Sequence, residues 1–263
     1  MQIKYIDIHS HLNLPEFDKD REKIIKQLKD ENIVTITVGT DFETSKFAIG
    51  LAEKNENLFA SVGIHPSDAE GEEFNYQEML KLAKNNKVVA IGECGLDYFR
   101  DENEDTKNSQ KELFEKHIKL AIEVGKPLMI HARASKGTMD AYLDTLKILE
   151  KYKKENNNFK ANFHFFAGNL EIAKRVIDLD FTMSFDGPIT FTSDYDEVIK
   201  NIPLEKIMAE TDAPFAAPVP FRGKICEPQM VKAIYEKIAE IKGLSKEETR
   251  LKIVENSRKV FKI

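Results

Sequence analysis

The sequence has little cysteine, no tryptophan and no long apolar run. Its 263 residues include two cysteines, Cys94 and Cys226, which are too few for a disulfide framework and favour a reducing compartment. No apolar stretch approaches the roughly 18 residues of a membrane span, and no signal peptide is evident at the N-terminus. We therefore expect a cytoplasmic protein that does not associate with membranes.

An excess of positive charge is also absent. The formal net charge is −6, which argues against a general polyanion-binding surface. It does not exclude a nucleic-acid substrate, because a few arginines and metal ions in a cleft can supply local positive potential. Hydrophobic residues make up 41% and charged residues 32% of the chain, a composition that allows an ordinary globular core.

Short apolar, β-rich runs alternate with segments of helical periodicity along the whole chain. The predicted strands span residues 3–8, 33–38, 58–64, 88–92, 127–130, 161–166, 181–185 and 206–209. Strands separated by helices pair in parallel, and eight such units predict an α/β fold, the closed (β/α)₈ TIM barrel. An open doubly wound sheet would require an early Gly-rich phosphate turn, which is missing. No composition break divides the chain, so we expect a single domain over residues 1–263.

Three residues are candidate helix caps. Asp18 and Asn169 precede apolar helical stripes, and each has a side-chain oxygen that can accept a hydrogen bond from a free backbone N–H. Ser245 is followed three residues later by Glu248, which is the spacing of a capping box. These residues predict where three of the helices begin.

The hexapeptide Asp7-Ile8-His9-Ser10-His11-Leu12 stands at the end of the first predicted strand. Side chains two apart on a strand point to the same side, so His9 and His11 should lie next to each other. Two converging imidazoles are typical of a divalent-metal site. An isolated pair of this kind is more often two surface histidines, so the metal hypothesis depends on further ligands.

Further candidate ligands fall at the ends of later predicted strands, where a barrel enzyme gathers its chemistry. The full set is His9, His11, His65, Glu93, His131, His164 and Asp212. Burying such groups is costly unless they are paired or metal-bound. Four histidines and two carboxylates suffice for two divalent ions that share a carboxylate, with zinc, magnesium or manganese as candidates. His117 lies on a helical stripe instead, so we expect it to be structural.

With these residues assembled, the sequence resembles the TatD family of metal-dependent deoxyribonucleases. The matching motifs are DIHSHL (7–12), GIHP (63–66), GECGLDYF (92–99), KPLMIHAR (126–133), FHFFAG (163–168) and ETDAPFAAPVPFRGK (210–224). The resemblance implies a barrel of the metallo-dependent hydrolase superfamily that removes nucleotides from the 3′ end of DNA. It also implies that His9 and His11 hold one metal ion, that His131 and His164 hold a second, and that Glu93 bridges them.

The resemblance implies roles for six more residues. Asp212 would complete the first metal site and orient or deprotonate the attacking water, which makes Asp212 and Glu93 the catalytic pair. Arg133 and Arg222 would hold phosphate, for which a guanidinium offers two parallel hydrogen bonds. The family positions beside the metals are His65, Asp97 and Tyr98. Asp97 could orient a ligand or contact substrate, while Tyr98 could stack on a base or simply pack.

The sequence departs from the family pattern at several positions near these motifs. The usual HCFSG reads His164-Phe165-Phe166-Ala167-Gly168 here, Ala134-Ser135 follow Arg133 where an acidic residue is common, and Cys226 replaces the usual asparagine. None of these changes touches a proposed metal ligand. They therefore bear on substrate preference rather than on hydrolysis.

The favoured function is a metal-dependent phosphodiester hydrolase, a 3′–5′ exodeoxyribonuclease acting on single-stranded DNA or on 3′ ends, without a protein partner. One alternative is hydrolysis of a small amide or ester, as in dihydroorotase-like enzymes, or of an aminoacyl-tRNA ester. Many such enzymes bridge their metals with a carbamylated lysine from the fourth strand, where this sequence has Glu93. A second alternative is a non-enzymatic binding protein, although no expected ligand is missing.

Overall fold

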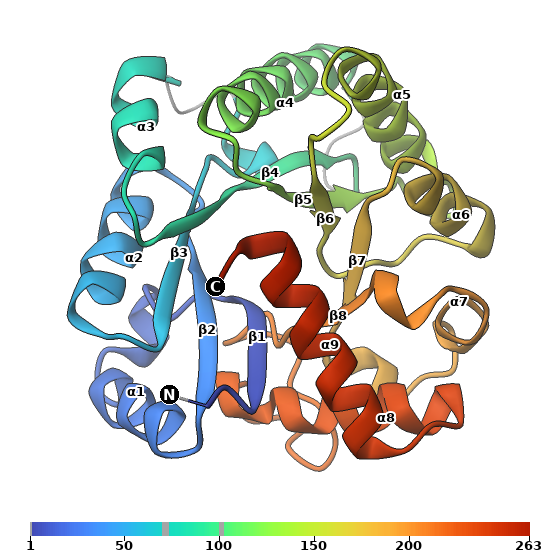
Figure 1. Ribbon diagram of the computed structural model, residues 1–263. Coiled ribbons are helices and arrows are strands. Elements are labelled where there is room, and N and C mark those ends of the chain that lie inside the picture. The colour runs from blue at the N-terminus through green and yellow to red at the C-terminus, as the bar shows by residue number, and fades with distance from the viewer. Residues whose placement is uncertain (1, 70–73, 100–102) are drawn as a thin grey trace.

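Eight parallel strands form a barrel surrounded by helices (Figure 1) in the computed structural model, which describes residues 2–69, 74–99 and 103–263. The strands are β1 (Tyr5–Ser10), β2 (Ile33–Val38), β3 (Leu58–Val62), β4 (Val88–Asp97), β5 (Leu128–Arg133), β6 (Ala161–Phe163), β7 (Thr182–Phe185) and β8 (Ile207–Ala209). Each strand pairs in parallel with the next one in the chain. The predicted (β/α)₈ TIM barrel is therefore confirmed.

The helices follow the strands in alternation. They are α1 (Arg21–Asp30), α2 (Phe42–Lys54), α3 (Tyr76–Ala83), α4 (Glu104–Val124), α5 (Asp140–Glu155), α6 (Leu170–Asp178), α7 (Asp196–Asn201), α8 (Val231–Lys242) and α9 (Lys246–Phe261). Helix α9 lies across the end of the barrel where the strands begin (Figure 1), and Asn256 donates a hydrogen bond to the Ile207 carbonyl at the start of β8. The opposite end, where the strands finish, stays available for a site.

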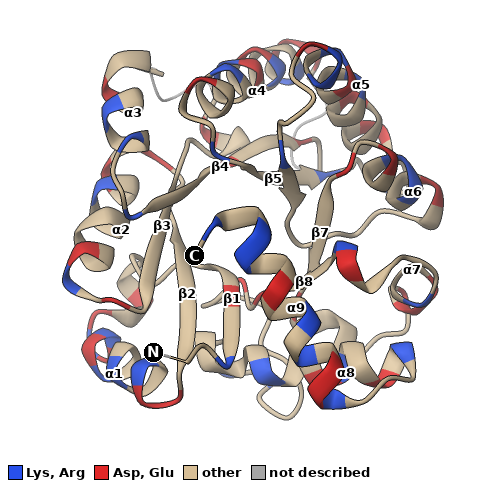
Figure 2. Cartoon of the chain, in the orientation of Figure 1, with Lys and Arg blue, Asp and Glu red and all other residues tan. Residues whose placement is uncertain are grey.

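The strands are apolar because they are covered on both faces. All six residues of β2 and all ten of β4 are buried. Charged residues lie mainly on the surrounding helices (Figure 2). Outer helices cover one face of a parallel sheet and the barrel interior covers the other, which explains why these strands read as continuous apolar runs. In the described part of the chain, no helix is long and apolar enough to cross a membrane.

The predicted ends of several strands were wrong. β4 continues past residue 92 to Asp97, β5 continues past residue 130 to Arg133, and β6 ends at Phe163 rather than at residue 166. Glycines conceal the extension of β4, because glycine is a poor strand former that allows close backbone approach. Gly92 and Gly95 both have φ +142°, and a Cβ at Gly95 would lie 2.0 Å from the carbonyl oxygen of β5 residue His131.

Two of the three predicted helix caps are confirmed. The side chains of Asn169 and Ser245 each accept a hydrogen bond from the backbone N–H three residues further on. Asp18 does not cap α1, because residues Pro15–Phe17 form a short 3₁₀ helix and α1 begins only at Arg21. The Asp18 carboxylate instead accepts a hydrogen bond from the Arg21 guanidinium at 2.7 Å.

The last strand returns to the first through few backbone contacts. Ser10 and Ala213 form an isolated parallel bridge, and the His11 N–H donates to the Ala213 carbonyl at 2.7 Å. Side chains strengthen this β1–β8 seam: Asp7 accepts hydrogen bonds from the Thr211 N–H at 2.9 Å and from the Thr211 hydroxyl at 2.7 Å. Both residues are fully buried, so the barrel closes on an internal polar contact.

Thr211→Val should weaken the β1–β8 seam. The substitution keeps the shape of the side chain but removes the hydroxyl that donates to Asp7, leaving a buried carboxylate oxygen with one partner fewer. We expect the free energy of unfolding in urea to fall by about 1–3 kcal/mol. Thr145→Val is the matched control, because the Thr145 hydroxyl is buried without a hydrogen-bond partner among the described residues. Equal losses for the two variants would contradict the role given to Thr211.

Candidate metal centre

A pocket of about 800 Å³ opens at the end of the barrel where the strands finish. The predicted site residues that line it are His11, His65, Glu93, Asp97, His131, Arg133, His164 and Asp212. His9 lies beneath its floor and is fully buried. The structure thus brings together every metal ligand predicted from the sequence, whereas two predicted substrate contacts, Tyr98 and Arg222, do not line the pocket.

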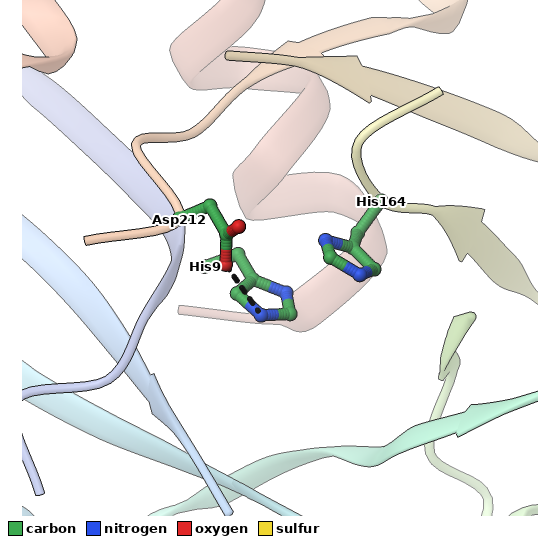
Figure 3. Close-up of side chains that lie close together, drawn as sticks. All are labelled: His9, His164 and Asp212. Atoms are coloured by element: carbon green, nitrogen blue, oxygen red, sulfur yellow. Dashed lines mark ion pairs between the residues drawn. The ribbon is translucent and has the colours of Figure 1, made fainter. Parts of the chain in front are cut away.

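The first group of side chains, here named the His9 cluster, consists of His9, His11, Glu93 and Asp212. The Nε2 atoms of the two histidines are 3.1 Å apart. His9 Nε2 is 3.4 Å from Glu93 Oε2 and 3.6 Å from Asp212 Oδ1, and His11 Nε2 is 3.4 Å from that same aspartate oxygen. Figure 3 shows the side chains of His9 on β1, His164 just after β6 and Asp212 after β8 turned toward one another.

Hydrogen bonds outside the cluster fix how these groups face it. His11 Nδ1 is 3.1 Å from the Val38 carbonyl oxygen, which can only accept, so Nδ1 carries the ring hydrogen and Nε2 presents a lone pair. The backbone N–H of Asp212 donates to the His9 carbonyl at 2.9 Å, and Asp212 takes a left-handed φ of +53°. Aspartate tolerates that conformation better than most residues, which explains its use at this turn.

The second group, named the His131 cluster, consists of His131, His164 and Glu93. Glu93 Oε1 is 2.9 Å from His131 Nδ1 and 2.8 Å from His164 Nε2, and the two ring nitrogens are 3.3 Å apart. The His9 cluster uses the other oxygen of Glu93. One carboxylate therefore faces both clusters, each with its own oxygen, which is the arrangement of a bridging ligand.

The donor geometry fits divalent metal ions. Ligand atoms at about 2.1 Å from a metal lie about 3.0 Å apart in octahedral and about 3.4 Å apart in tetrahedral coordination. The separations in the His131 cluster are 2.8–3.3 Å, and those in the His9 cluster are 3.1–3.8 Å. The residues present therefore fit the metal ions that the resemblance implies, without selecting zinc, magnesium or manganese.

The electrostatics of the two clusters favour an ionised Glu93. Burial alone would raise the pKa of its carboxyl group, but the neighbouring His164, His65 and His131 hold that pKa well below its usual range. Burial would lower the pKa of His131, yet hydrogen bonds to Asp97 and Glu93 raise it. Metal ions bind neutral imidazoles, so loading the His131 cluster should release protons and strengthen as the pH rises.

Asp97 controls the orientation of His131. Its Oδ2 is 3.1 Å from His131 Nε2, and its Oδ1 accepts a hydrogen bond from the Phe99 N–H at 3.0 Å. In the neutral ring that binds metal, the carboxylate therefore holds the hydrogen on Nε2 and leaves the lone pair of Nδ1 on the side of Glu93, where a metal ion would lie. A carboxylate behind a metal-binding histidine is a common outer ligand. Of the two roles that the sequence left open for Asp97, this geometry favours the orientation of a ligand.

His65 presents a hydrogen-bond donor instead of a ligand atom. The Ser67 N–H donates to His65 Nδ1 at 3.1 Å, so the hydrogen of the neutral ring lies on Nε2, which is 3.6 Å from Glu93 Oε1. Burial lowers the pKa of His65 to about 4, which keeps the ring neutral near pH 7. His117 supports the same loop, because its Nε2 accepts a hydrogen bond from the Ile64 N–H at 2.9 Å.

The predicted substrate residues divide into two groups. Arg133 lines the pocket, with its guanidinium carbon 3.9 Å from the centre of the Phe99 ring. Tyr98 is 1% exposed and donates a hydrogen bond to Asp144 on α5 at 3.0 Å, so its ring packs away from the pocket. Arg222 also lies outside the pocket lining, and its guanidinium stacks on the Phe191 ring. The neighbouring Phe99, which is 50% exposed, lines the pocket where Tyr98 does not.

Some residues at the site were not predicted from the sequence. Glu210 is fully buried and accepts hydrogen bonds from the Ser184 hydroxyl and from the Phe165 N–H beside His164. Glu210 stands two residues before Asp212, at the end of the last strand, and this position could have been used to predict that it lies at the site. Phe165 and Phe215 add aromatic surface to the pocket, for which the sequence pattern carried no signal.

The chain is similar to known metal-dependent hydrolases. Residues 6–262 match the family model described as "TatD related DNase". The chain is 39% identical over 261 residues to a Bacillus subtilis protein named "Uncharacterized metal-dependent hydrolase YabD", with 98% of both chains covered. It also resembles the crystal structure of YjjV, a TatD homologue from Escherichia coli, with a TM-score of 0.88, 26% identity and full coverage of both chains.

Fold, donor clusters and similarities together define a metal-dependent hydrolase with a TIM barrel fold. Within that class, the chain belongs to the TatD-related DNase family.

Asp97→Asn should weaken metal binding at the His131 cluster. The remaining oxygen must still accept from the Phe99 N–H, so the new NH₂ group would face His131 Nε2. The imidazole would then carry its hydrogen on Nδ1 and lose the lone pair directed at Glu93. We expect a 10- to 100-fold loss of metal affinity at this cluster, measured by competition with a chromophoric chelator.

Asp144→Asn is the control for this variant. Asp144 accepts the hydroxyl of Tyr98 and pairs with Lys111 at 2.7 Å, but it lies outside the metal centre. It should bind metal like the unchanged protein. Unaltered affinity in Asp97→Asn would show that Asp97 does not set the tautomer of His131.

Proposed function

We propose that this protein is a metal-dependent phosphodiester hydrolase that removes nucleotides from the 3′ end of DNA, single-stranded DNA in particular. The observation that carries the proposal is the Glu93 carboxylate, whose two oxygens face separate histidine pairs at the floor of an open pocket. A pair of ions held in this way can act on both the attacking and the leaving oxygen of a displacement. The match to the TatD-related DNase family supports DNA as the substrate.

Two divalent ions would be held by the residues of the two clusters. His9, His11 and Asp212 would bind one, His131 and His164 the other, with Glu93 shared. When bound, the ions would supply Lewis-acid stabilisation of phosphoryl oxygens and a water of lowered pKa. The mixed imidazole and carboxylate donors favour zinc, manganese or a similar ion, and magnesium is the third candidate.

Asp212 is the proposed general base. It lines the pocket, and only one of its oxygens is engaged with the histidines of its cluster. Burial would raise the pKa of its carboxyl group, but His11 and His9 bring that pKa below its ordinary value. The group is therefore ionised near pH 7 and able to accept a proton from an attacking water, a step that typically contributes 10²- to 10⁴-fold to the rate.

Arg133 and His65 are the proposed contacts to the substrate phosphate. Arg133 has no ion pair among the described residues, and the Phe99 ring holds its guanidinium over the pocket, so its hydrogen-bonding edge is free for phosphate oxygens. His65 offers the Nε2 hydrogen as a neutral donor beside Glu93. Together they would orient the phosphodiester, and neither side chain carries a negative charge that would repel the phosphate.

The first test is digestion of a 5′-labelled single-stranded oligonucleotide by the metal-loaded protein, with magnesium or manganese added. We expect a ladder that shortens from the 3′ end. Asp212→Asn should slow the reaction about 10²- to 10⁴-fold, because it removes the proton acceptor. A chelator should abolish the reaction.

Two outcomes of this digestion would contradict the proposal. Fully metallated protein that leaves DNA intact but hydrolyses simple esters or amides would favour the alternative superfamily chemistry. Full activity in Asp212→Asn would remove the proposed base. Asp144→Asn, which alters a carboxylate outside the pocket, should digest DNA at the original rate.

Arg133→Gln should reduce the salt dependence of DNA binding. Each phosphate contact on a single strand contributes about 0.7 to the slope of log affinity against log salt concentration. In an Asp212→Asn background, which slows cleavage, losing Arg133 should lower that slope by about 0.7. Arg222→Gln should change the slope less, because Arg222 does not line the pocket. The opposite ranking would assign the phosphate contact to Arg222.

A further inference from the structure

One wall of the pocket is apolar and aromatic. It is formed by Met139, Tyr142, Phe165, Ala167 and Tyr195, from the start of α5, the segment after β6 and the start of α7. Phe165 directly follows the metal-facing His164, and the centres of their rings are 6.4 Å apart. A substituent of a phosphate bound at the His131 cluster would therefore meet this wall.

Phe165 occupies the wall in a strained backbone conformation. Its φ is +44°, in the left-handed region that glycine adopts freely and that bulky residues rarely adopt. The buried Glu210 carboxylate accepts a hydrogen bond from the Phe165 N–H and holds this conformation. Strain of this kind at a pocket indicates that the side chain has a function there. Phe165 and Ala167 are also two of the positions at which the sequence departs from the family pattern.

Two tyrosine hydroxyls offer hydrogen-bond donors at the same wall. The Tyr142 hydroxyl oxygen accepts from the Ala167 N–H at 2.9 Å, and its hydrogen has no acceptor within the described ranges. The Tyr195 hydroxyl has no hydrogen-bond partner in those ranges either. Burial raises the pKa of both phenols, so both keep their hydrogens near pH 7.

We propose that this wall is a subsite for one nucleobase, stacked on Phe165 and bonded at its edge by Tyr142 and Tyr195. A nucleobase is flat, has hydrogen-bond acceptors at its edge and is joined to a phosphate through a sugar, which matches the ring, the free donors and the neighbouring metal centre. The inference rests on the proposed function, since it presumes a nucleotide substrate. It adds a contact to the base, whereas the metal centre would contact only the phosphate.

Binding of two ligands that differ only by the base tests the subsite directly. Metal-loaded protein is titrated with thymidine 5′-monophosphate and with 2-deoxyribose 5-phosphate by calorimetry. Stacking of a base on an aromatic side chain predicts that the nucleotide binds at least about tenfold more tightly. Equal affinities for the two ligands would overturn the proposal.

Phe165→Gly should bring the ratio of the two affinities down to about twofold or less while leaving the fold intact, because glycine adopts the observed φ without strain. Phe165→Leu, which keeps an apolar wall without a ring, should lose most of the preference as well. Phe47→Ala is the control, since Phe47 is 44% exposed on α2 and lies outside the pocket lining. A full base preference in both Phe165 variants would exclude stacking on this ring.

The same variants separate this inference from the proposed function. Methyl p-nitrophenyl phosphate has no base, whereas the p-nitrophenyl ester of thymidine 5′-monophosphate carries one. Phe165→Gly should lower kcat/KM at least about tenfold for the nucleotide ester only. Equal losses on both esters would place Phe165 in support of the metal centre and overturn the subsite. Base-dependent binding without any hydrolysis of DNA would instead retain the subsite and reject the nuclease.

Discussion

The contact between Glu93 and the histidines around it governs the architecture of the barrel mouth. A carboxylate this deeply buried would be protonated or expelled if it stood alone, because desolvation opposes its charge. Imidazoles supplied by β1, β5 and the end of β6 surround it, so strands that are far apart in the sheet order must converge on one side chain. Only a closed barrel brings these strand ends together, which is why the fold and the site cannot be separated.

A second layer of buried carboxylates holds the first. Asp97 sets the tautomer of His131, Glu210 accepts from the Phe165 N–H beside His164, and Asp7 ties the first strand to Thr211, next to Asp212. Each carboxylate accepts hydrogen bonds, and these offset the free-energy cost of removing it from water. The weak seam between β1 and β8 thus coincides with the proposed general base, so the stability of the closure and the position of Asp212 depend on the same bonds.

The sequence predicts the barrel, and the gathering of polar side chains at one end of it, because both follow from the alternation of strands and helices. Alternating strands and helices define the fold, and polar residues that end apolar strands must meet at one end. Side-chain direction was harder to predict. Two glycines hide the continuation of β4, so the alternation that turns Tyr98 outward and leaves Phe99 at the pocket could not be followed past Gly92. The left-handed backbone of Phe165 depends on Glu210, a contact 45 residues away that no local pattern records.

Net charge limits how the proposed substrate can be recognised. A chain with a formal charge of −6 gains no long-range attraction for a polyanion, so affinity must arise from contacts within the pocket. Those contacts are the metal centre, Arg133 on its Phe99 support, and exposed rings such as Phe215, which is 51% exposed beside His11. Stacking requires bases that are free of a duplex, since paired bases present no open face. The proposed nuclease should therefore act on frayed ends and single strands in preference to paired DNA.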